Sequence, residues 1–207
     1  MSDHTLPPSG TVIVGMTGSG KSTFAYRLLL NAPAACRFLF DDLGRAASRL
    51  KLRPCCTASE LESALASRWV IFNPHRMFPG QTKSAFRFFC QWVYDASKRG
   101  PGKKYFLVDE IWQWQDNHQI PRELALVVQT GREENLELLC ATQLPHKVNA
   151  SITGMSTELV CFRVDEDLAL ARVQELGADP DVVRTLPLGR FMSVNRLTRS
   201  KLDGRVF

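Results

Sequence analysis

Gly15-Met16-Thr17-Gly18-Ser19-Gly20-Lys21-Ser22-Thr23 is the stretch of sequence that decides the fold. It matches G-x-x-x-x-G-K-[ST], and it stands between an apolar run at residues 11–14 and a segment of helical pattern at residues 24–30. Its glycines let the backbone turn so that several N–H groups point at one phosphate, above the positive end of the following helix. The pattern predicts a strand, a phosphate-binding loop and a helix, with all nine residues around a nucleoside triphosphate.

Two residues of this loop have side chains with specific predicted roles. Lys21 is expected to place its ammonium between the β- and γ-phosphates, and the Ser22 hydroxyl to bind Mg²⁺. The alternative is a glycine-rich turn with an incidental lysine. Because glycine makes up about 7 % of average sequences, such a match arises by chance in about one chain in a hundred or fewer. ATP and magnesium are therefore the expected ligands.

Composition describes a soluble globular chain. The 207 residues are 44 % hydrophobic and 23 % charged, which predicts one domain over residues 1–207 with its core at about 11–195 and a basic tail at 196–207. No apolar run is long enough to span a bilayer and no signal peptide is recognisable, so a cytoplasmic location is expected. The six cysteines are scattered without a C-x-x-C pair, so neither a disulfide nor a zinc site is expected. A net charge of +5 permits a nucleic-acid partner without requiring one.

Apolar runs alternate with segments of helical spacing along the chain. Strands are predicted at residues 11–14, 37–40, 69–72, 105–108, 136–141, 159–164 and, as the last one, 190–195. Helices are predicted at residues 21–31, 59–67 (with a serine cap), 86–97, 122–130, 146–155, 166–176 and after Asp179-Pro180. Residues 44–54 are polar and basic, and no helix is predicted there. The alternation predicts an α/β fold with a mostly parallel sheet and helices on both faces.

Asp109 and Glu110 directly follow the predicted strand at 105–108. In phosphate-loop enzymes an aspartate at this place, the Walker B aspartate, holds Mg²⁺, so Asp109 is expected to share the metal with Ser22. Glu110 is placed to orient and deprotonate the attacking water. A glutamate here favours hydrolysis, since a kinase must keep water out. A small-molecule kinase remains an alternative, but it needs an arginine-rich lid and an acceptor pocket, and no small-molecule acceptor is expected.

Two further residues flank the predicted strand at 136–141. Gln143 follows that strand, where an amide can sense the γ-phosphate or the attacking water. Arg132 precedes it, and a guanidinium from a neighbouring subunit commonly completes the site of oligomeric ATPases. On spacing alone, a glutamine after a strand is ordinary loop chemistry, and most arginines in such loops are only solvated.

The phosphate loop resembles that of the FtsK–HerA superfamily of DNA-pumping ATPases. Residues 131–162, with Gly131-Arg132 and Ala141-Thr142-Gln143, and residues 188–194 are similar to two further regions of that superfamily. The resemblance implies a RecA-like P-loop NTPase core of the additional-strand, catalytic-glutamate type. It also implies that Arg132 acts in trans, that Gln143 is the sensor, and that a homo-oligomeric ring, usually a hexamer, surrounds double-stranded DNA.

The short chain leaves no room for the accessory domains of the cellular members. In this it resembles the genome-packaging ATPases of tailless icosahedral, tectivirus-like viruses with an internal membrane, which drive DNA into a preformed capsid. That resemblance implies a capsid vertex or viral membrane protein as a partner, and a location in the host cytoplasm or on the virion. The alternatives are a virion-assembly, extrusion or secretion ATPase that moves protein, and a cellular DNA pump.

Two polar loops are candidates for DNA contact. Residues 73–83 carry Arg76 and Lys83, and residues 112–119 carry His118 after the Walker B strand. A solvated surface loop accounts equally well for each, as packing between subunits does for Trp112 and Trp114.

Overall fold

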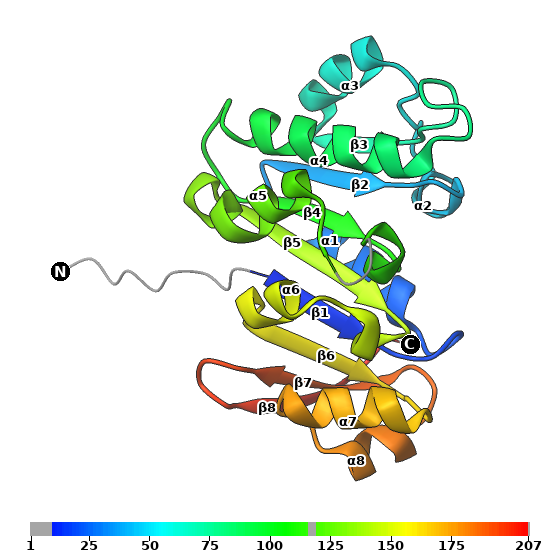
Figure 1. Ribbon diagram of the computed structural model, residues 1–207, viewed down its shortest axis with the longest axis vertical. Coiled ribbons are helices and arrows are strands. Elements are labelled where there is room, and N and C mark those ends of the chain that lie inside the picture. The colour runs from blue at the N-terminus through cyan, green and yellow to red at the C-terminus, as the bar shows by residue number, and fades with distance from the viewer. Residues whose placement is uncertain (1–9, 116–118, 207) are drawn as a thin grey trace, which may run out of the picture.

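The structure is a computed structural model that describes residues 10–115 and 119–206 (Figure 1). Its centre is one eight-stranded sheet in the order β3-β2-β4-β5-β1-β6-β7-β8. The strands are β1 (Gly10–Val14), β2 (Cys36–Phe40), β3 (Trp69–Phe72), β4 (Lys104–Val108), β5 (Leu136–Thr142), β6 (Glu158–Phe162), β7 (Arg190–Asn195) and β8 (Lys201–Arg205). All neighbours from β3 to β6 are parallel, whereas β7 and β8 are antiparallel additions at one edge. The mostly parallel α/β fold is confirmed.

Helices cover both faces of the sheet (Figure 1). They are α1 (Lys21–Asn31), α2 (Arg45–Leu50), α3 (Ala58–Ala64), α4 (Thr82–Ser97), α5 (Arg122–Thr130), α6 (Ala150–Met155), α7 (Asp167–Glu175) and α8 (Pro180–Thr185), with short 3₁₀ turns η1 (Leu65–Ser67), η2 (Ile111–Trp114), η3 (Gly131–Glu134) and η4 (Pro145–Lys147). Successive strand residues point to opposite faces, so Val12 and Val14 pack with the core under α4, α5 and α7, and Ile13 with the core under α1. These two cores fix the sheet between its helices.

Several predicted elements differ from the structure. Residues 44–54 contain α2, whose first turn is capped by the Asp41 carboxylate, which accepts from the N–H groups of Ala46 and Ala47 at 3.1 and 2.8 Å. The cap of α3 is Thr57, which accepts from the N–H of Glu60 at 3.2 Å, so the predicted serine cap is wrong. The helix predicted at 146–155 is divided into η4 and α6 by the extended backbone of Val148.

The last strand is β8, so the prediction that the sheet ends at residue 195 is wrong. Alternation is absent from the sequence of β8, because most of its side chains are exposed at the edge of the sheet. Beyond it, the N–H of Val206 donates to the carbonyl of Gly189 at 2.8 Å, and the N–H of Gly189 donates to the carbonyl of Ser19 at 3.0 Å. Arg27 of α1 binds the Val206 carbonyl. The chain end therefore supports the phosphate loop.

The order of the strands brings three chain segments to one edge of the sheet. β5 lies between β1 and β4, as the additional strand of the predicted core type does. Val14 is in register with Thr142, and Val108 with Cys140. Because parallel strands end at the same edge, the loop after β1 lies beside the residues that follow β4 and β5.

Among the described helices, none has both the length and the apolar character needed to cross a membrane. The six cysteines are free thiols, and all except Cys56 are buried.

Candidate active site

The glycines of the loop are required by its geometry. Gly18 and Gly20 have φ angles of 78° and 108°, in the region that favours glycine. A Cβ on Gly15 would lie 2.6 Å from both Phe162 Cβ and Ser19 Oγ, which no side chain tolerates. The loop is also fixed at its start, because the Gly15 N–H donates to the carbonyl of Thr142 at 3.2 Å. The sequence thus forms a rigid turn that is held on the end of β5.

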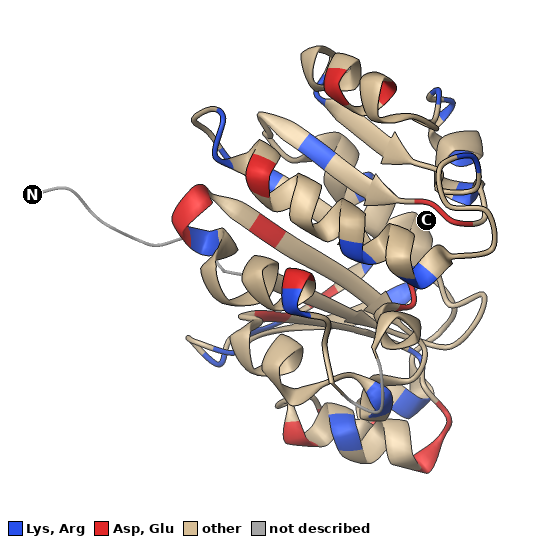
Figure 2. Cartoon of the chain, turned by 45° about the horizontal axis from the view of Figure 1, so that its top comes forward, with Lys and Arg blue, Asp and Glu red and all other residues tan. Residues whose placement is uncertain are grey.

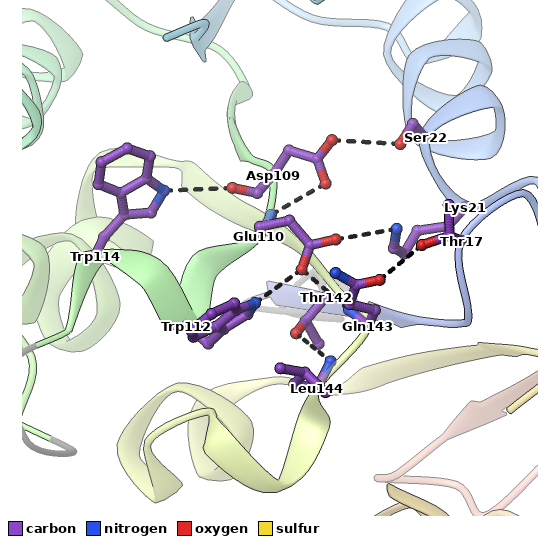
Figure 3. A network of polar contacts seen from close by, with 10 residues as sticks. All are labelled: Thr17, Lys21, Ser22, Asp109, Glu110, Trp112, Trp114, Thr142, Gln143 and Leu144. Atoms are coloured by element: carbon purple, nitrogen blue, oxygen red, sulfur yellow. Dashed lines mark hydrogen bonds and ion pairs between the residues drawn. The ribbon is translucent and has the colours of Figure 1, made fainter. Parts of the chain in front are cut away.

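Lys21 and Glu110 form an ion pair at the centre of the site (Figure 3). Lys21 Nζ lies 3.2 Å from Glu110 Oε1, and the side chains are only 9 % and 21 % exposed. The other carboxylate oxygen, Oε2, accepts from the backbone N–H of Gln143 at 3.1 Å and from Trp112 Nε1 at 3.0 Å. Glu110 itself has a left-handed backbone with φ 47° and ψ 52°. Three partners therefore hold one carboxylate.

Ser22 and Asp109 provide oxygen atoms suited to a magnesium ion. Ser22 Oγ donates to Asp109 Oδ2 at 3.3 Å, and the other oxygen, Oδ1, accepts from the N–H of Glu110 at 3.0 Å. Mg²⁺ in such sites is held by one or two protein oxygens together with substrate phosphates and waters. The two residues fit that requirement, and they would hold the ion between the loop and β4.

A hollow of about 440 Å³ opens over these residues. It is lined by Thr17, Gly18, Lys21, Ser22, Tyr26, Leu39, Phe40, Asp41, Asp42, Leu43, Arg45, Ala46, Leu107, Asp109, Glu110, Gln113, Trp114 and Gln143. A second hollow of about 270 Å³ lies on the outer side of the loop and is lined by Met16, Gly18, Gly20, Lys21, Ser22, Thr23 and Arg49. Gly15 and Ser19, although part of the loop, are buried and line neither hollow. Each of the other loop residues lines at least one of the two hollows.

Gln143 faces the phosphate loop. Its side-chain Oε1 accepts from Thr17 Oγ1 at 2.8 Å (Figure 3), while its N–H binds Glu110. A contact to Gln143 can therefore affect both the loop and the carboxylate.

The residues at the end of β2 join the site although no role was predicted for them. Asp41, Asp42 and Arg45 line the larger hollow, and the polar pair at 41–42 directly after an apolar strand was the only sequence signal. Burial raises the pKa of Tyr26, in the same hollow, to about 12, and the charges of Asp109 and Asp41 add to this effect. Tyr26 is therefore a neutral hydroxyl at physiological pH.

Arg132 does not lie with the other predicted residues. It is exposed on η3, before the amino end of β5, whereas the phosphate loop lies at the carboxyl end. The seven residues of β5 separate the two ends by roughly 20 Å. Arg132 is therefore accessible to another molecule and does not approach the nucleotide site of its own chain.

The candidate DNA contacts lie outside this network. Arg76 is exposed on the segment between β3 and α4, whereas Lys83 is exposed in the first turn of α4, so the loop predicted at 73–83 ends before Thr82. His118 lies outside the described residues. Trp114 stacks on Phe86 at 5.1 Å, within its own chain. In the view of Figure 2, Lys and Arg are interspersed with Asp and Glu over the described residues.

Fold and loop together define the class: the chain has the fold of the P-loop NTPases. The solved structures that it resembles include the genome-packaging NTPase B204 of Sulfolobus turreted icosahedral virus 2, with a TM-score of 0.75 and 17 % identity over 96 % of this chain and 97 % of that one. B204 has also been solved with ATP-γ-S, at a TM-score of 0.74 and 16 % identity over 97 % of this chain and 99 % of that one.

Two larger proteins contain a similar unit. The cytoplasmic domain of the type VII secretion ATPase EccC from Thermomonospora curvata matches at a TM-score of 0.62 and 16 % identity, over 96 % of this chain and 24 % of that one. The pCW3 conjugation coupling protein TcpA matches at 0.57 and 15 % identity, over 95 % and 59 %. EccC and TcpA are FtsK–HerA ATPases, so the resemblance noted from the sequence is confirmed at the level of the fold. No protein-family model matches the chain, and no curated protein sequence does.

Proposed function

We propose that this protein is an ATP-driven translocase that moves double-stranded DNA into a preformed viral capsid. The observation that carries the proposal is the meeting of Lys21, Ser22, Asp109 and Glu110 at one edge of a sheet. The correspondence in fold with B204, over nearly the whole of both chains, supports packaging as the task.

Hydrolysis would use the two oxygens of Glu110 differently. Oε2 is held by two N–H donors, whereas Oε1 is bound by Lys21. When Lys21 turns to the β- and γ-phosphates, Oε1 is released, and it can take a proton from a water that approaches the γ-phosphate. Bound Mg²⁺ would supply positive charge for the phosphate oxygens from its place at Ser22 and Asp109.

A second subunit would complete the site. Arg132 is exposed and distant from its own phosphate loop, which suits a guanidinium that acts on the nucleotide of a neighbour. Gln143, in contact with Thr17 and Glu110, would report the state of the nucleotide. We infer that the protein forms a homo-oligomeric ring, a hexamer, with DNA in its channel. Its docking partner would be a capsid vertex or a viral membrane protein.

DNA contact would be made through phosphates, without a preference for sequence. The net charge of +5 supports such contact, and Arg76 and Lys83 are exposed for it. Each phosphate neutralised by Lys or Arg releases counterions, so affinity falls as salt rises.

The test is ATP hydrolysis with and without long double-stranded DNA across a range of salt, with Lys21→Ala as the inactive control. Stimulation by DNA that fades with salt supports the translocase. Hydrolysis that is indifferent to DNA but stimulated by a protein substrate would favour a secretion or extrusion ATPase. Dependence on a small acceptor would favour a kinase. Either of the last two results refutes the proposal.

A further inference from the structure

The backbone of Glu110 is held in an unfavourable conformation. Its φ of 47° places a residue with a side chain in the left-handed region, which costs about 1–2 kcal/mol. This conformation starts η2 immediately after β4. Such strain persists only where surrounding contacts determine the conformation, and the Glu110 side chain has three such partners.

Trp112 is the only side chain, among the described residues, that donates an uncharged N–H to this carboxylate. Its Nε1 lies 3.0 Å from Oε2, and η2 brings the indole back over the glutamate two residues before it (Figure 3). When Lys21 has turned to the phosphates, the N–H of Gln143 alone would hold one oxygen and leave the carboxylate free to rotate about it. A second donor on the same oxygen, carried by a rigid ring and directed from another side, restricts that rotation.

Lys147 connects the indole to the segment that carries Gln143. Its Nζ lies 4.9 Å from the centre of the Trp112 ring, within the range of a cation–π contact. Lys147 ends η4, just beyond Gln143 in the chain. Movement of that segment therefore displaces a charge that rests on the ring.

Gln115 links the same two segments through its side-chain amide. It is buried, and its Oε1 accepts from the backbone N–H of Asn149 at 2.7 Å. Its Nε2 lies 3.5 Å from the carbonyl of Lys147. The segments 111–115 and 143–149 thus form one connected unit around the Glu110 carboxylate.

We propose that Trp112 is a positioning residue for hydrolysis: its indole N–H fixes the Glu110 carboxylate, and Lys147 ties the orientation of that indole to the segment that carries Gln143. The inference rests on the proposed hydrolysis by Glu110. It adds a route by which displacement of residues 143–149 turns the carboxylate away from its working position.

The main test is Trp112→Phe, which keeps an aromatic ring under Lys147 and removes the N–H. We expect kcat for ATP to fall about 10- to 100-fold, with KM and the Kd of a fluorescent ATP analogue within about threefold of wild type. The matched control is Trp92→Phe, because Trp92 Nε1 also donates to a glutamate, Glu62 Oε1, at 2.8 Å, but on α4. The control should leave kcat unchanged.

Double variants separate positioning from a general loss of structure. If Trp112 acts through Glu110, Trp112→Phe should cause no further loss of kcat in a Glu110→Gln background. A full multiplicative loss would overturn the inference. Lys147 is exposed, so Lys147→Gln tests the same unit without altering the core; we expect a several-fold fall in kcat that Lys147→Arg restores.

Wild-type kcat in Trp112→Phe, or a rise in KM alone, would also overturn the inference while leaving the proposed hydrolysis intact. If the wild-type chain hydrolyses no ATP, or if Glu110→Gln hydrolyses it normally, the proposed function and the inference fail together.

Discussion

The Lys21–Glu110 ion pair makes a prediction about binding as well as about catalysis. In Glu110→Gln, Lys21 loses the carboxylate 3.2 Å away while its side chain stays 9 % exposed. Removing one partner of a fully buried pair costs about 3–5 kcal/mol, and of a fully exposed pair about 0–1 kcal/mol. The Lys21–Glu110 pair is intermediate in exposure, and the amide oxygen of the variant can still accept from Lys21. We therefore expect Glu110→Gln to destabilise the nucleotide-free protein by about 1–2 kcal/mol.

This cost falls only on the nucleotide-free protein. With ATP bound, the phosphates pair with Lys21 in the wild type and in the variant. By the thermodynamic cycle, the variant therefore gains on ATP binding the free energy that it lost in the nucleotide-free state. We expect Glu110→Gln to bind ATP about 5- to 30-fold more tightly than wild type. Without nucleotide its Tm should be about 2–8 °C lower. Hydrolysis should be about 10²- to 10⁴-fold slower, because the general base is lost.

The assay is calorimetric titration with a non-hydrolysable ATP analogue, together with thermal unfolding with and without that analogue. Glu137→Gln is the matched control, because it breaks a different ion pair near the opposite end of β5. In that pair, Glu137 Oε2 lies 2.7 Å from Lys103 Nζ. It should lower Tm equally in both conditions and leave affinity unchanged. An unchanged Tm without nucleotide in Glu110→Gln, with affinity equal to wild type or weaker, would refute the reasoning.

Three further outcomes are expected. Arg132→Ala and Lys21→Ala are each inactive alone, and their mixture regains partial ATPase activity if Arg132 acts in trans; a mixture with no turnover contradicts that role. Burial raises the pKa of Cys140 and Cys161 to about 12. The unfolded thiols lose their protons near pH 9.0 while the native ones keep them, so the free energy of unfolding should fall as pH rises above about 9, by roughly 1–2 kcal/mol per thiol at pH 10.5. Urea unfolding should show a flatter pH dependence when both are replaced by alanine, and an equal slope would contradict this. Deleting β8 and the residues after it removes the buried Val206 from the core under α1, so Tm should fall by about 4–8 °C and the KM for ATP should rise several-fold; an unchanged KM would show that the chain end does not support the phosphate loop.

Sequence determined the parts of this protein that are local in the chain. The phosphate loop and α1 were predicted with their observed bounds, because nine contiguous residues carry both the turn and its chemistry. The α/β alternation followed from apolar runs and helical spacing. Asp109 and Glu110 were predicted as site residues because the change from apolar to acidic residues marks the end of a strand.

Local patterns failed where a contact from outside the segment itself decides its conformation. Asp41 caps α2 from the preceding strand end, so composition at 44–54 gave no helix signal. Strand β8 pairs with β7 at the edge of the sheet, and most of its side chains are exposed. No alternation of apolar and polar residues therefore marks it in the sequence.

Only the tertiary structure decided how the site is joined. Ser22 and Asp109 are 87 residues apart in the chain, and Thr17 and Gln143 are 126 apart. Their meeting depends on β5 lying between β1 and β4, and strand order is set by the packing of the whole sheet rather than by any one segment. The Lys21–Glu110 pair and the indole on the same carboxylate depend on that order too, because hydrogen bonds and ion pairs form between surfaces that only folding brings together.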